Sequence, residues 1–320
     1  MASLKNFIEN KPDAEFPPEK GRYHLYVAVS CPFACRALMA INLKGLQEFV
    51  DITVVHPVYQ RTRPDDENDT HNGWAFVDPK TTPFLPGPTG KGQYSTAGAS
   101  TDPIHGVKYI RDLYERVTKE KVAYSVPLLW DKKKDTIVST ESADIVRMFN
   151  EAFEELKPST IDLYPEELRQ EIDDVNTWVT ESIVYGVYKA GFAPSQGLYE
   201  AGVEKVYAGL DRVEELLGQH RYLVGNKITE ADIRLFVALI RFDVAYSALY
   251  KLNKKLIADY HNIFNYVCDI YQLPGVNETV DFNHIKLTYY GSQVNLNPSG
   301  IIPVGPPVDY SVPHDRARFD

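Results

Sequence analysis

The pattern of residues 22–55 predicts a strand, a helix and a second strand in close succession. Residues 22–29 and 49–55 are rich in aromatic and β-branched side chains, which is typical of strands. Between them, apolar residues recur at helical spacing over residues 33–43, and Gly45 is placed to end that helix. A crossover of this length allows the two strands to pair in parallel, so we expect an α/β first domain.

The remainder of the first domain alternates irregular and regular segments. Residues 56–104 hold many prolines and glycines without a sustained period, which predicts an insertion over this domain. Beyond it, the patterns predict a helix, a two-stranded hairpin and another helix, at residues 108–118, 126–130 with 136–139, and 139–150.

The second half of the chain is helical in pattern. Residues 151–174 carry nine acidic and two basic residues with two prolines, which predicts a solvated linker. Helical periodicity then continues to about residue 290, with candidate helices at 166–187, 198–218, 230–250 and 255–271. Thr229 and Asp232 match a capping box at the start of the third. Five prolines between residues 298 and 313 predict an extended tail.

Composition excludes several classes of protein. The 320 residues carry a formal net charge of −10 without a basic run, so a nucleic-acid partner is not expected. No stretch of about 18 apolar residues predicts a membrane span, and no signal segment opens the chain. Three cysteines favour a reducing compartment, so we expect a cytoplasmic protein. The eight histidines show no ligand spacing, and we predict no metal site.

Cys31 lies where the first strand gives way to its helix. Proline is favoured at the first helical position, so Pro32 makes Cys31 the N-cap, which faces free N–H groups and the positive end of the helix dipole. Such a setting lowers a thiol pKa below its ordinary value of about 8.5 and favours a reactive thiolate. The alternative is that Cys31 is a small core residue.

The other two cysteines have different settings. Cys35 lies one helical turn beyond Cys31, and two interpretations stay open: a thiol that forms a disulfide with Cys31, or an inward-facing core residue. Cys268 lies in an apolar helical segment and is predicted to be core.

Two further short motifs would suit an extended peptide ligand. Pro127 opens a predicted strand, and a cis bond before it would turn the backbone of Val126 outward to pair with such a peptide. Glu141 and Ser142 open the following helix, where N–H groups and a hydroxyl would bind a carboxylate and the acidic side chain an amine. The alternative for Glu141 and Ser142 is an ordinary helix start.

Taken together, these elements resemble the glutathione transferases, which have a thioredoxin-like first domain and an all-helical second domain. Finer motifs are similar to those of the Xi class, the glutathionyl-hydroquinone reductases, and they occur in the same order between about residues 20 and 307. They lie at residues 71–76, 187–193, 223–226 with 229–232, 241–243, 269–275 and 297–306.

The resemblance implies an α/β thioredoxin-like N-terminal domain plus an all-α C-terminal domain, which is the glutathione transferase fold. The expected parts are a leader (1–19), a glutathione-binding domain (20–157) with the insertion at 56–104, a helical domain (158–297) and a Pro-rich extended tail (298–320). Because the family is dimeric, a homodimer is also expected.

The resemblance further implies a reductase that uses glutathione as co-substrate. It would remove glutathione from hydroquinone conjugates, and from related aryl or ketone conjugates, through a mixed disulfide on Cys31, releasing hydroquinone and oxidised glutathione. Carried over by motif, glutathione would be held by Trp74, Val126, Pro127, Glu141 and Ser142. The quinone pocket would be lined by Tyr188 and one or both of Tyr289 and Tyr290.

The chain departs from the family pattern near the thiol and near the C-terminus. Phe33 and Cys35 stand where the family usually has Trp and His, and Thr288, Gly291 and Gln293 differ from the residues usual beside the tyrosine pair. Two alternative functions remain: a conjugating transferase, which would use a hydroxyl such as that of Ser30, and a non-catalytic interaction module of the same fold.

Overall fold

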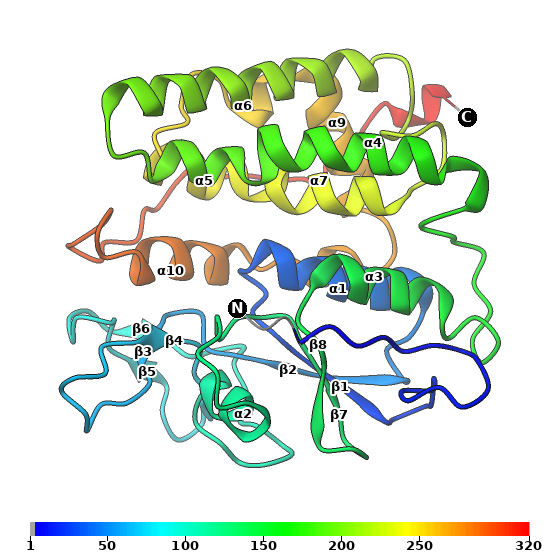
Figure 1. The fold of residues 1–320 in the computed structure, drawn as a ribbon. Coiled ribbons are helices and arrows are strands. Elements are labelled where there is room, and N and C mark those ends of the chain that lie inside the picture. Colours follow the sequence, from blue (N-terminus) through cyan, green and yellow to red (C-terminus); the bar gives the residue numbers. More distant parts are fainter. Residues whose placement is uncertain (1–3, 320) are drawn as a thin grey trace. The chain divides into compact units, whose positions relative to one another are not determined.

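The computed structural model describes residues 4–319, and their contacts divide the chain into two compact units (Figure 1). The first unit comprises the residues up to Ser159 together with Thr279–Pro303, and the second comprises the remainder. The division after Ser159 falls inside the acidic stretch that we predicted as a linker.

The domain to which one C-terminal segment belongs differs from the sequence prediction. Residues 279–297, which we predicted within the helical domain, group with the first unit. Helical periodicity could not distinguish the two cases, because it shows that a helix has a buried face and not what that face packs against.

The first unit contains a four-stranded sheet in the order β2-β1-β7-β8. Strand β1 (Tyr23–Val27) pairs in parallel with β2 (Val50–Val54) and antiparallel with β7 (Leu128–Asp131), which forms a hairpin with β8 (Thr136–Ser139). The predicted parallel pairing is therefore confirmed. All five residues of β1 are buried, as expected for a strand with helices over both faces.

Helices lie on both sides of this sheet. Figure 1 shows α1 (Pro32–Lys44) and α3 (Ser142–Glu151) side by side over one face, with α2 (Ile110–Val117) on the other side. Helix α1 ends where expected, since Gly45 adopts the left-handed conformation with a φ of 68°. Helix α10 (Phe282–Ser292) completes the unit.

The predicted insertion contains two small hairpins that the sequence did not indicate. Strands β3 (Gln60–Arg61) and β4 (Asn72–Gly73) form one, and β5 (Phe84–Leu85) and β6 (Tyr94–Ser95) form the other. Strands of two residues are too short to produce an alternating pattern, so the prediction described this segment only as irregular.

The described part of the leader packs onto the sheet. Asn6 N donates to Val138 O (2.8 Å), and Lys5 bridges Ser139 on β8. Ile8 and Phe16 are buried. The leader is therefore part of the first unit and covers an edge strand that would otherwise be open.

The second unit is helical. Its α-helices are α4 (Arg169–Val179), α5 (Gly186–Gly191), α6 (Gln196–Leu217), α7 (Glu230–Arg241), α8 (Ser247–Leu249) and α9 (His261–Tyr271). Two π-helical segments, η2 (Thr180–Val184) and η3 (Phe242–Tyr246), interrupt what we predicted as continuous helices. The remaining single turns are η1 (Glu166–Leu168), η4 (Ile257–Asp259), η5 (Asn277–Thr279) and η6 (Arg316–Phe319).

The start of α7 follows its sequence signal. Asp232 Oδ2 accepts from the backbone N of Thr229 (2.8 Å) and lies 3.0 Å from its hydroxyl, so the predicted capping box is confirmed. Its other oxygen accepts from Leu223 N and from the Tyr266 hydroxyl, both at 2.9 Å. One buried carboxylate thus fixes a helix start and two neighbouring segments.

The C-terminal tail, predicted to be extended over residues 298–320, differs from that prediction at its end, because residues 316–319 form the 3₁₀ turn η6. Residues 301–315 contain no helix or strand. Arg316 then packs within the second unit, where it donates to the carbonyls of Leu217 and Arg221 (2.8 Å each).

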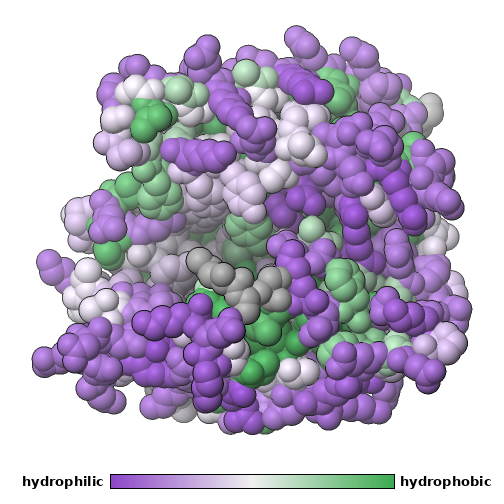
Figure 2. Space-filling view, in the orientation of Figure 1, coloured by the Kyte–Doolittle hydropathy of each residue, from purple (hydrophilic) through white to green (hydrophobic). Residues whose placement is uncertain are grey.

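Hydrophilic side chains cover most of the molecular surface that Figure 2 shows. None of the described helices is long and apolar enough to cross a membrane.

Candidate active site around Cys31

Cys31 is the N-cap of α1, as the sequence predicts. Its backbone is extended (φ −78°, ψ 121°), and Pro32 occupies the first helical position. The side chain is half-buried, and its Sγ lies 3.6 Å from the carbonyl oxygen of Val126. The helix start therefore presents a thiol beside an irregular backbone segment, where its dipole favours an anion.

The Val126 segment has the conformation expected of it. The bond between Val126 and Pro127 is cis, and both residues are buried. One residue earlier, the carbonyl of Ser125 accepts from the Tyr114 hydroxyl (2.9 Å), which attaches this segment to α2. The structure thus brings Cys31, Val126 and Pro127 together.

Glu141 is the N-cap of α3. Its carboxylate accepts from Ala143 N (3.3 Å), and its side chain remains partly exposed. Ser142 is only 2% exposed, and its Oγ lies 3.4 Å from Nη1 of the buried Arg36 on α1. Arg36 therefore connects the helix that starts at Cys31 to the helix that starts at Ser142.

Trp74 follows β4 and is buried. Its ring meets that of Tyr59 edge to face, with the centroids 4.6 Å apart. Burial raises the pKa of Tyr59, and the negative charge of a Cys31 thiolate raises it further, so this phenol stays protonated. Sequence analysis missed Tyr59, because no motif distinguishes it among 21 tyrosines.

The predicted quinone-binding tyrosines belong to different units. Tyr289 and Tyr290 lie on α10 in the first unit and are buried, whereas Tyr188 lies on α5 in the second and is half-buried. The hydroxyls of Tyr188 and Tyr246 are 3.4 Å apart, and Tyr250 contacts both rings. Tyr246 ends a π-helical segment, a feature often found near functional sites.

Cys35 points away from solvent. It is 2% exposed, and its Sγ lies 3.0 Å from the carbonyl oxygen of Val29 and 3.5 Å from that of Thr279. Cys268 is also buried, and burial raises the pKa of its thiol to about 12. No disulfide joins any of the three cysteines. Within residues 4–319, no three His, Cys, Asp or Glu side chains gather as they would around a metal ion.

Family comparisons agree with this fold. A model of the glutathione S-transferase N-terminal domain matches residues 30–152, and one of the C-terminal domain matches residues 196–267. The first match begins one residue before Cys31 and ends one residue after α3. The second covers α6, α7 and most of α9.

Individual relatives show which class within this family the chain resembles. Glutathionyl-hydroquinone reductase YqjG of Escherichia coli K12 is 44% identical over 306 residues, or 95% of this chain and 85% of that protein. Glutathionyl-hydroquinone reductase PcpF of Sphingobium chlorophenolicum is 38% identical, over 92% of this chain and 86% of that protein.

Solved structures give the same grouping. The glutathione-bound structure of YqjG has a TM-score of 0.88 at 41% identity and covers 98% of this chain and 96% of that one. The glutathione transferase Xi of Phanerochaete chrysosporium has a TM-score of 0.85 at 41% identity and covers 98% and 99%. The chain therefore belongs to the glutathione transferase family and, within it, to the Xi class of glutathionyl-hydroquinone reductases.

Proposed function

We propose that this enzyme removes glutathione from glutathionyl-hydroquinones, with a second glutathione as co-substrate. The observation that carries the proposal is the Cys31 thiol at the N-cap of α1, 3.6 Å from the Val126 carbonyl, in a chain 44% identical to a glutathionyl-hydroquinone reductase. A thiol at a helix N-terminus favours attack on sulfur rather than activation of a bound thiol.

The proposed reaction has two steps, and in each a thiolate attacks a sulfur atom. The Cys31 thiolate attacks the sulfur of the conjugate, the aromatic carbon leaves and takes a proton, and hydroquinone is released. The resulting mixed disulfide is attacked by the thiolate of a second glutathione, which regenerates Cys31 and yields oxidised glutathione. Tyr188, with Tyr289 or Tyr290, donates hydrogen bonds to the ring oxygens and supplies the proton to the leaving carbon.

Five residues hold the glutathione portion in this proposal. The backbone of Val126, turned by Pro127, pairs with the peptide, and Trp74 covers it. Glu141 binds the free amine, and the α-carboxylate of the γ-glutamyl end lies at the start of α3, where Ser142 belongs to the first turn. The Ser142 hydroxyl is buried against Arg36, so the N–H groups of this turn supply the donors.

Each of the two alternative functions would require different features of the site. A conjugating transferase would need an accessible hydroxyl such as that of Ser30, but this side chain is fully buried and its Oγ lies 2.6 Å from Thr288 Oγ1. A non-catalytic module would not need a reactive thiol at a helix start. We also propose that the enzyme is a cytoplasmic homodimer, by analogy with its class.

A pulse of a glutathionyl-hydroquinone followed by mass spectrometry tests the proposal. The expected result is one glutathione on Cys31, release of hydroquinone, and loss of both in Cys31→Ala. Cys268→Ala is the matched control and should retain turnover, because that thiol is buried in the helical unit. Full turnover by Cys31→Ala, without any adduct on the unsubstituted enzyme, would contradict the proposal.

A further inference from the structure

Helix α2 holds the backbone around Trp74. The first N–H of the helix, from Ile110, donates to the Trp74 carbonyl (3.1 Å), and Phe76 N donates to Lys108 O (2.8 Å). Ala75 also forms a bridge with Tyr109. Trp74 and its neighbours are therefore attached to the start of α2 along three consecutive residues.

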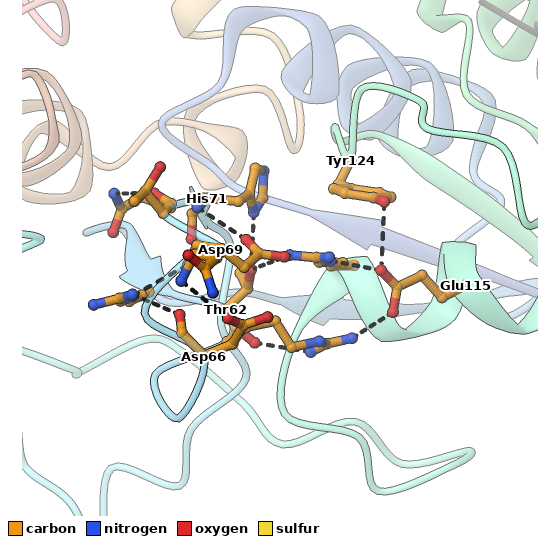
Figure 3. Close-up of polar contacts among 12 residues, drawn as sticks. Thr62, Asp66, Asp69, His71, Glu115 and Tyr124 are labelled. Atoms are coloured by element: carbon orange, nitrogen blue, oxygen red, sulfur yellow. Dashed lines mark hydrogen bonds and ion pairs between the residues drawn. The ribbon is translucent and has the colours of Figure 1, made fainter.

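The same helix reaches the far end of the hairpin that carries Trp74. Arg111, whose side chain is 14% exposed, pairs with Asp69 (Nη1 to Oδ2, 2.6 Å) and lies 3.2 Å from the Thr62 hydroxyl (Figure 3). Both partners lie in the loop between β3 and β4. The Asp69 carboxylate also accepts from His71 N (3.1 Å), which shapes the loop as it enters β4.

This hairpin needs such an attachment. Strands β3 and β4 share only two residue pairs, and two-stranded hairpins are marginally stable on their own. At the open end of the hairpin, the rings of Tyr59 and Trp74 pack together, and the charge of a Cys31 thiolate raises the pKa of Tyr59. Side chains at the loop end therefore determine how firmly these two rings are held.

Arg111 also contacts the segment that leads to Val126. Its guanidinium lies 5.3 Å from the centroid of the Tyr124 ring, and the Tyr124 hydroxyl is 3.4 Å from Glu115 Oε1, the oxygen that Arg111 Nε binds at 2.6 Å. The Tyr124 ring meets that of His71 edge to face, with the centroids 5.2 Å apart. Figure 3 shows that side chains of the loop around Asp69, of α2 (Glu115) and of the Tyr124 segment meet in one cluster of polar contacts.

The neighbouring arginines keep Glu115 ionised. Burial tends to raise the pKa of Glu115, but hydrogen bonds from Arg111 and Arg63 outweigh it and lower that pKa. Arg63 also pairs with Asp112 (2.8 Å), so two arginines face three carboxylates. A guanidinium can bind two carboxylates and lie against an aromatic ring at once, which an ammonium group cannot do.

We propose that Arg111 is a positioning residue for the glutathione site, acting through Trp74 on one segment and Val126 on the other. The inference rests on the proposed function, because it assumes that these two residues hold glutathione. Arg111 itself does not touch the substrate in this proposal; it fixes the loop of the hairpin and the Tyr124 segment against α2.

Calorimetric binding of glutathione in a Cys31→Ala background tests the inference without a covalent adduct. Arg111→Met is expected to raise the Kd about tenfold, because the segments that carry Trp74 and Val126 are then no longer fixed before glutathione binds. Asp69→Asn removes the loop partner while leaving α2 unchanged, so it tests the same attachment even where Arg111→Met folds poorly, and it should also weaken binding. Arg116→Met, on the same helix with an exposed pair to Asp135, is the matched control and should leave the Kd unchanged.

A double-mutant cycle separates positioning from a general loss of stability. If Arg111 acts through Trp74, the losses from Arg111→Met and Trp74→Phe will sum to more than the loss in the double variant. Additive losses, or an unchanged Kd in both Arg111→Met and Asp69→Asn, would overturn the inference. Absence of glutathione binding in the Cys31→Ala parent would instead contradict the proposed function.

Discussion

The side-chain oxygens of Ser30 and Thr288 lie 2.6 Å apart, although 258 positions separate them in the sequence. Thr288 Oγ1 lies equally close to the carbonyl oxygen of Pro57. Ser30 directly precedes Cys31, and Pro57 precedes the hairpin of Trp74 by a few residues. A hydroxyl on α10 therefore joins the two segments that lead into the candidate site.

We expect Ser30→Ala to retain reductase activity within about threefold. The Ser30 hydroxyl is buried, but its partner Thr288 also bonds the Pro57 carbonyl, so the substitution should cost only about 1 kcal/mol of stability. Parallel assays of hydroquinone release and of chlorodinitrobenzene conjugation check this, with Cys31→Ala as the inactive comparison. Loss of activity in Ser30→Ala, with activity retained in Cys31→Ala, would favour the conjugating transferase.

The three cysteines should differ sharply in their reaction with a thiol reagent. Cys31 is half-buried, whereas Cys35 and Cys268 are almost fully buried. We expect about one thiol per chain to react quickly in the native protein and three in denaturant. After mild oxidation, an unchanged count in denaturant would favour the core interpretation of Cys35, and the loss of two thiols would favour a Cys31–Cys35 disulfide.

The contact between Tyr188 and Tyr246 predicts an effect that depends on the substrate. In the proposed mechanism Tyr188 donates to the ring oxygens, and the Tyr246 hydroxyl lies where it can orient that donor. Tyr188→Phe and Tyr246→Phe should each lower kcat/KM for a glutathionyl-hydroquinone about tenfold. A mixed disulfide between glutathione and a small alkyl thiol has no ring oxygens and should react normally. Tyr185→Phe, at an exposed position on the same segment, is the control. Equal losses on both substrates would contradict a role at the ring.

Two buried histidines predict loss of stability in mild acid. Burial lowers the pKa of His24 to about 4 and that of His56 to about 4. Below pH 6.5 the unfolded chain binds protons that the folded chain does not bind until about pH 4, so the free energy of unfolding falls as the pH drops through this range.

Between pH 7 and pH 5 each of these histidines should lower the free energy of unfolding by about 2 kcal/mol, measurable by urea unfolding. His56→Leu should remove about half of this pH dependence. Identical pH profiles for His56→Leu and the unsubstituted protein would contradict the prediction.

A side chain at Gly191 on α5 would clash with a neighbouring ring. A Cβ there would lie 2.3 Å from Cγ of Tyr250, whose ring packs against Tyr188. We expect Gly191→Ala to lower the free energy of unfolding by about 1–3 kcal/mol. Gly197→Ala, in a helix with open space around it, should be neutral or slightly stabilising. Thermal unfolding of the two variants measures both effects, and equal melting temperatures would contradict the expected clash.

Features that depend on residues close together in the sequence were predicted, whereas features that depend on distant residues or leave no repeating pattern were missed. The helix start at Cys31, its end at Gly45 and the capping box of Thr229 were all predicted, since each depends on residues within four positions of one another. The hairpins of the insertion and the π-helical turns were not predicted, because they leave no period in the sequence.

By itself the sequence determined the strand–helix–strand unit, the thiol at its helix start and the motifs that mark the class. These are set by local backbone geometry and by the alternation of apolar residues. Only the tertiary structure decided that α10 belongs to the first unit, that Tyr59 packs against Trp74, and that Arg111 contacts both the Asp69 loop and the Tyr124 segment. Such contacts depend on how distant segments pack, and no local pattern encodes the partner of a side chain.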